Sequence, residues 1–155
     1  MKVSLVAGFL NSHSVELAEE LNKRFDFKFI ATEYHPEQEG CDFGRKAIDA
    51  DYVINYYEDE NKDFCREFVN ECDFVIFAGS SDELMQERMK TGKLSFFYSE
   101  RFFKKGRIRG FIPKNFINIY NRILKYSKND MLKVLCASAY LPCDLSLYGF
   151  DTDKC

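Results

Sequence analysis

The chain has 155 residues, a length that corresponds to one domain. Hydrophobic residues make up 46% of it and charged residues 30%, which excludes a disordered protein. Its longest apolar runs, such as Phe74 to Ala78, are too short to cross a bilayer, and its first residues lack a signal-peptide core, so we expect a cytoplasmic protein.

Short apolar runs alternate with amphipathic segments along the whole chain. The apolar runs predict six strands, at 3–7, 27–31, 52–55, 74–78, 93–98 and 133–137. Apolar residues at helical spacing predict intervening helices, at about 12–25, 45–50, 64–72, 80–92, 113–124 and 142–148. This alternation predicts an α/β fold: a single Rossmann-like, doubly wound domain with a mainly parallel six-stranded sheet and helices on both faces.

Two helices have more specific sequence signals. Ser80 and Glu83 have the spacing of a capping box at the start of the helix that ends near Gly92. Pro113 opens a helix whose apolar face is expected to carry five side chains: Phe116, Ile117, Tyr120, Ile123 and Leu124.

The six cysteines do not form a recognisable metal or redox motif. Cys65, Cys72 and Cys136 lie in apolar segments, where a free thiol behaves as a small hydrophobe, and no two cysteines have Cys-x-x-Cys spacing. The two histidines, His13 and His35, lie near no cysteine in sequence. We therefore predict no metal site and no cofactor in this domain.

Ligands of doubly wound sheets bind at the carboxyl ends of the strands, so the loops there carry the functional candidates. The first loop, 8–13, has neither a Gly-x-Gly-x-x-Gly fingerprint nor a P-loop, which excludes the nucleotide-binding classes that depend on them. His13 in this loop is either a general base or a histidine with no role beyond the helix start. His35 lies in a long acidic segment and is expected to be solvated.

Two further loops present polar groups. Gly79, Ser80 and Ser81 begin a helix and could bind an anion, but the acidic residues directly behind them favour a capping role. Tyr98, Ser99, Glu100 and Arg101 could grip a sugar or a phosphate; the alternative is a Glu100–Arg101 surface pair worth about 1 kcal/mol or less.

The charge is unevenly distributed. Residues 96–128 carry a net charge of +8, whereas the rest of the chain carries −11. Within this segment, basic and aromatic residues alternate over 102–112, a pattern that favours an anionic membrane surface over a solvated loop. The overall charge of −3 disfavours nucleic acid as a partner.

Two stretches, 92–106 (GKLSFFYSERFFKKG) and 134–140 (VLCASAY), resemble the amino-terminal half of a bacterial glycosyltransferase of the GT-B fold. Residues 73–80 and 84–88 are similar as well, so the resemblance extends over nearly the whole chain. It implies an acceptor-binding domain of an enzyme that moves a sugar from a nucleotide-sugar to a cell-surface glycan or lipid-linked acceptor. The donor would bind in a second, carboxy-terminal domain, so the chain is expected to be one half of a longer enzyme and inactive alone.

The resemblance also implies a set of site residues. His13 would be the catalytic residue. The acceptor would contact Asn11, Gly79, Ser80, Tyr98, Glu100, Arg101, Ser138 and Tyr140. Lys104, Lys105, Arg107 and Arg109 would hold the inner face of the cell membrane or an anionic acceptor. The alternative is a standalone flavodoxin-like or receiver-like module that binds a small ligand or a partner.

Overall fold

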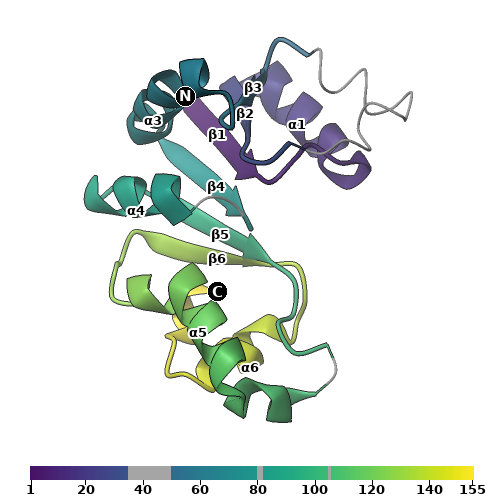
Figure 1. Ribbon diagram of the computed structural model, residues 1–155, viewed down its shortest axis with the longest axis vertical. Helices are drawn as coiled ribbons and strands as arrows, with labels where there is room; N and C mark the ends of the chain where they lie inside the picture. The colour runs from purple at the N-terminus through teal and green to yellow at the C-terminus, as the bar shows by residue number, and fades with distance from the viewer. Residues whose placement is uncertain (35–49, 80–81, 105) are drawn as a thin grey trace.

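The computed structural model describes residues 1–34, 50–79, 82–104 and 106–155. Its centre is one sheet of six strands: β1 (Lys2–Ala7), β2 (Asp26–Ala31), β3 (Val53–Asn55), β4 (Phe74–Ala78), β5 (Ser95–Ser99) and β6 (Leu132–Cys136). The strand order is β3-β2-β1-β4-β5-β6, and all five pairings are parallel (Figure 1). The predicted Rossmann-like, doubly wound fold is therefore confirmed.

Helices connect the strands as the sequence predicts. The α-helices are α1 (Ser12–Arg24), α3 (Lys62–Glu71), α4 (Asp82–Lys90), α5 (Pro113–Arg122) and α6 (Leu141–Ser146). Short 3-10 helices lie at η2 (Asp59–Asn61), η3 (Arg107–Phe111), η4 (Leu124–Tyr126) and η5 (Thr152–Lys154). The helix expected near 45–50 lies outside the described residues.

Each face of the sheet has its own core. On one face, α1 packs through Val15 and Ala18 against alternate residues of β1 and β2, among them Leu5 and Phe29. On the other face, α3, α4, α5 and α6 pack over the remaining residues, such as Val6. Because neighbouring residues of β1 are buried on opposite faces, the strand appears in the sequence as an unbroken apolar run.

The helix cover is unequal at the β6 end of the sheet. On the face that α1 covers, Tyr98 of β5 is 45% exposed and Leu135 of β6 is 38% exposed. Tyr98 and Leu135 are paired in the sheet register. The described helices therefore leave this corner of the sheet open.

The predicted apolar face of α5 is only partly correct. Ile119 is buried, and Ile123 and Leu124, just past the helix end, are buried too. The other three predicted core residues are exposed: Phe116 by 43%, Ile117 by 56% and Tyr120 by 46%. The helix meets the sheet through one narrow edge, so most of its apolar residues lie at the surface rather than in the core.

Arg88 of α4 organises the amino-terminal edge of the sheet. Its side chain is completely buried, and its guanidinium donates to five backbone carbonyls: Val69, Asn70, Cys72, Asp73 and Leu94. Val69 and Asn70 lie in the last turn of α3 and Cys72 is its C-cap, where helical carbonyls lack partners within the helix. Arg88 therefore caps α3 and joins it to the starts of β4 and β5.

No helix among the described residues is both long enough and apolar enough to cross a membrane.

Candidate functional site

The strand order reverses between β1 and β4, and the carboxyl ends of these two strands meet at that point (Figure 1). Ligands of doubly wound sheets bind along this edge. The segments that follow β1, β4, β5 and β6 all begin there, so we place the candidate site along this edge.

After β1, Asn11 serves as a cap for α1. Its side-chain oxygen accepts from the backbone N–H of Ser14 at 3.1 Å, and its own N–H donates to Ser14 Oγ at 3.0 Å. His13 lies in the first turn of the same helix, and its side chain is outside the described set. The substrate-binding role of Asn11 and the catalytic role of His13 stay predictions.

After β4, Gly79 turns the chain with φ +70°, a conformation that a residue with a Cβ rarely adopts. A Cβ at this position would lie 3.3 Å from Nη2 of Arg122, the last residue of α5. Gly79 thus allows both the turn and the close approach of a guanidinium. Ser80, the other residue predicted in this loop, lies outside the described residues.

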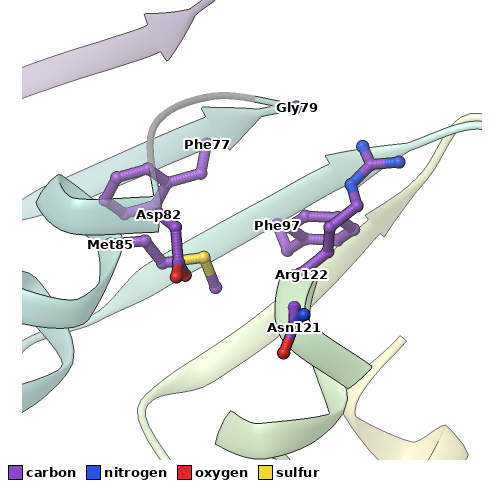
Figure 2. A pocket seen from close by; sticks show the side chains of 7 residues that line it. All are labelled: Phe77, Gly79, Asp82, Met85, Phe97, Asn121 and Arg122. Carbon is purple, nitrogen blue, oxygen red and sulfur yellow. The ribbon is translucent and has the colours of Figure 1, made fainter. Parts of the chain in front are cut away.

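A pocket of about 90 Å³ opens beside Gly79, between α4 and the end of α5 (Figure 2). Its apolar walls are Phe77 of β4, Met85 of α4 and Phe97 of β5; its polar lining is Asp82, Asn121 and Arg122. Asp82 is paired, since its carboxylate accepts from Lys125 Nζ at 2.6 and 2.7 Å.

Beyond β5 and β6, three side chains form a cluster. The guanidinium of Arg101 lies over the ring of Tyr140 at 4.9 Å, and its Nε lies 3.4 Å from Oδ2 of Asp144. Asp144, in α6, is completely buried and also accepts from the backbone N–H of Phe103 at 3.2 Å. Tyr140 is 61% exposed, so the cluster runs from the core to the surface.

The buried ion pair of this cluster is imperfectly aligned. Within the described part of the chain, Arg101 Nε and Asp144 Oδ1 are buried and make no hydrogen bond. A buried polar atom without a hydrogen bond costs free energy, about 1–3 kcal/mol. Such a cost is tolerated more readily at a site where a ligand binds than in an ordinary core.

The remaining predicted residues near β5 and β6 have local partners. Glu100 pairs with Lys104, so the Glu100–Arg101 surface pair that was the alternative to a binding role is not the ion pair formed. Ser138 Oγ accepts from the N–H of Tyr140 in the turn before α6. Tyr98 lies on the opposite face of β5 from Phe97, away from the pocket.

The basic segment is at the surface. Arg107 donates to the carbonyl of Cys143 at 2.8 Å, and Arg107 and Arg109 are both exposed in η3. Between them Ile108 is 83% exposed, and Phe111 after them is 78% exposed. Lys105 lies outside the described residues.

A second network joins the end of β3 to α4. Tyr56 donates to Glu83 at 2.7 Å, and Arg66 of α3 binds the same carboxylate. Burial and the bond to Glu83 raise the pKa of Tyr56 to about 12, while Tyr56 and Arg66 hold the pKa of Glu83 below its ordinary value. The carboxylate expected in a capping box is therefore engaged by two other side chains.

Metal ligands do not gather in the described ranges, where no three His, Cys, Asp or Glu side chains come together. Burial raises the pKa of the Cys65 thiol to about 11 and that of Cys72 to about 12. These thiols are core side chains rather than nucleophiles.

No family model matches the chain, and the curated proteins and solved structures compared with it include no match.

Sequence reasoning missed Arg122 and Asp144. A signal exists for each: Asp144 lies three residues after the buried Leu141, and Arg122 lies three residues after the buried Ile119. A charged residue at the helical spacing of core positions marks a group that must find a partner in the interior.

Proposed function

We propose that the chain is the acceptor-binding, amino-terminal domain of a glycosyltransferase. The enzyme would move a sugar from a nucleotide-sugar to a cell-surface glycan or lipid-linked acceptor, and this domain would be inactive alone. A second domain would bind the donor, and the acceptor would lie along the carboxyl edge of the sheet.

One observation carries this proposal. The two stretches that resemble glycosyltransferases are far apart in sequence, yet Arg101 of the first lies over the ring of Tyr140 of the second, and Asp144, just past the second stretch, pairs with Arg101. An exposed aromatic ring beside a charged side chain is suited to a sugar, whose faces are apolar and whose rim donates and accepts hydrogen bonds. The cluster lies at the edge where doubly wound folds bind ligands.

The alternative is a standalone module that binds a small ligand or a protein partner at the same edge. The sheet topology suits both functions, because fold alone does not determine function. The two proposals differ in the ligand: an acceptor-binding domain would bind a saccharide, whereas a standalone module would bind a different small ligand or a protein and no saccharide.

The partner surface we propose is an anionic membrane at its cytoplasmic face. Six exposed apolar side chains follow one another along η3, the connecting Ile112 and α5, and we call them the η3–α5 surface: Ile108, Phe111, Ile112, Phe116, Ile117 and Tyr120. The exposed cations Lys104, Arg107, Arg109 and Lys114 flank it in sequence. Apolar side chains enter the lipid interface while cations attract its headgroups, so the combination suits a lipid-linked acceptor.

A transfer assay tests the function. The protein encoded by the whole gene is incubated with labelled nucleotide-sugars and with lipid and glycan acceptors, beside the 155-residue chain. We expect transfer by the whole protein and none by the chain. Replacing Tyr140, Tyr140→Ala, should raise the acceptor KM about tenfold, a loss of about 1.4 kcal/mol, and leave the donor KM unchanged.

The matched control is Met131→Ala, which removes an exposed apolar side chain just before β6, at the opposite edge of the sheet. It should change neither KM. Transfer by the 155-residue chain alone, or a donor KM that changes with Tyr140→Ala, would contradict the proposal.

A further inference from the structure

The guanidinium of Arg122 lacks a charge partner in the part of the chain that the structure describes. It packs over the rings of Phe97 and Phe102, at 5.7 and 5.8 Å, and makes no ion pair or hydrogen bond with a described residue. Burial alone lowers its pKa. A partly buried cation without a carboxylate loses hydration that no described partner replaces, whereas the fully buried Arg88 donates to five carbonyls.

The position of the group points to a ligand. Arg122 is the last residue of α5, where a positive charge interacts favourably with the negative end of the helix dipole. A fully solvated arginine would give the same interaction, so the dipole does not explain the burial of Arg122. Instead its guanidinium reaches the carboxyl end of β4 and approaches Gly79, whose missing Cβ leaves the space open (Figure 2). The rings of Phe97 and Phe102 lie beside the guanidinium, and its N–H donors lie at the edge of the sheet near Gly79.

No described residue that lines the pocket neutralises the charge of the Arg122 guanidinium. Asp82 is the one carboxylate among the described lining residues, and it pairs with Lys125 and accepts from the Tyr126 hydroxyl at 3.2 Å. Asn121 is neutral. Phe77, Met85 and Phe97 supply apolar walls against which the uncharged part of a ligand can pack.

We infer that Arg122 and Gly79 form a binding site for the phosphate group of a ligand whose remainder lies on Phe77, Met85 and Phe97. The planar fork of a guanidinium matches the oxygens of a phosphate, and the bonds are charge-assisted. The inference goes beyond the proposed function and does not depend on it, because binding alone tests it.

The experiment is an NMR titration of the isotope-labelled chain at constant ionic strength, with inorganic phosphate and with glucose 6-phosphate. We expect the amide signal of Gly79 and the Nε signal of Arg122 to move together with one dissociation constant. We expect tighter binding of glucose 6-phosphate, because its sugar can pack against Phe77, Met85 and Phe97. Equal binding of the two probes would contradict the packing of a ligand's remainder on these walls.

Variants decide whether Arg122 holds the ligand. Arg122→Gln should weaken binding at least about tenfold, and Arg122→Lys, which keeps the charge and loses the fork, should weaken it less. Lys128→Gln removes the same charge from an exposed position and should bind as the native chain does. Gly79 and Arg122 signals that do not move, or native affinity in a folded Arg122→Gln, would overturn the inference.

Discussion

Arg101 connects the buried Asp144 to the exposed ring of Tyr140. Both charges belong to one small cluster, yet Arg101 keeps 26% of its side-chain surface in solvent while Asp144 keeps none. Removing Arg101 alone would therefore leave a buried charge, whereas removing Asp144 alone would leave a cation that can still reach solvent. We propose that the pair also positions Tyr140 in the acceptor surface.

The first prediction concerns this pair. Arg101→Met leaves the buried carboxylate without its cation, so it should lower the free energy of unfolding by about 2 kcal/mol. Adding Asp144→Asn to it should restore part of that loss, because the double variant holds no buried charge. Urea denaturation of the native chain, both single variants and the double variant measures the coupling. Strictly additive losses would show that the two groups do not interact.

The second prediction concerns the hydroxyl of Tyr56. Its pKa is raised to about 12, so the protonated form stabilises the fold below the ordinary pKa of 10 and this contribution is lost as pH rises toward 12. Tyr56→Phe should cost about 1 kcal/mol at pH 8. The cost should shrink by pH 11, and urea denaturation at both values measures it. An equal cost at the two pH values would contradict the assigned shift.

The Glu83 carboxylate of the same network changes stability with pH in the opposite direction to the Tyr56 hydroxyl. Because Tyr56 and Arg66 lower the pKa of Glu83, its contribution is present above the ordinary carboxyl pKa and is lost as pH falls through the lowered value.

At the scale of elements, Arg88 joins one helix to a second helix and two strands. Its role is structural, since it lies at the amino-terminal edge, away from the candidate site. We expect Arg88→Met to lower the free energy of unfolding by about 3 kcal/mol, because several buried carbonyls lose their donor together. Lys90→Met, an exposed change on the same helix, is the matched control and should have little effect. If Arg88→Met changed the free energy of unfolding as little as Lys90→Met does, the capping role of Arg88 would be contradicted.

The elements themselves were predictable from local patterns, because each strand of a two-sided parallel sheet appears as one apolar run. Which residues of α5 are buried could not be predicted in this way. Helical spacing groups Phe116, Ile117 and Tyr120 with Ile123, but which edge meets the sheet depends on the distant strands. The same limit applies to the site: Arg101 and Tyr140 were predicted one by one, whereas Asp144 and Arg122 gain their importance only through tertiary contacts.

At the scale of the whole molecule, charge and exposed apolar surface coincide. The segment of net charge +8 contains all six residues of the η3–α5 surface, while the remaining sequence is strongly acidic. Soluble proteins seldom expose several large apolar residues together without a partner. This coincidence supports the membrane proposal independently of the sugar chemistry.

The membrane proposal gives a quantitative expectation. Neutralising Arg107 and Arg109 together, as Arg107→Gln and Arg109→Gln, should weaken binding to anionic vesicles by roughly thirtyfold, about 1 kcal/mol for each cation. Co-sedimentation at low and high salt measures it, and high salt should weaken the native protein as well. Lys90→Gln with Lys128→Gln removes the same charge elsewhere and should bind normally. Salt-independent binding, or a control as weak as the variant, would rule out this surface.

We propose that the carboxyl edge of the sheet binds an acceptor saccharide. The most direct measurement is chemical-shift mapping of the labelled 155-residue chain with a panel of oligosaccharides. We predict saturable shifts at Arg101 and Tyr140 with at least one saccharide, and none around Lys90 at the opposite edge. Shifts confined to the opposite edge, or no binding by any saccharide while a small non-sugar ligand binds the cluster, would rule out an acceptor site here and favour the standalone module.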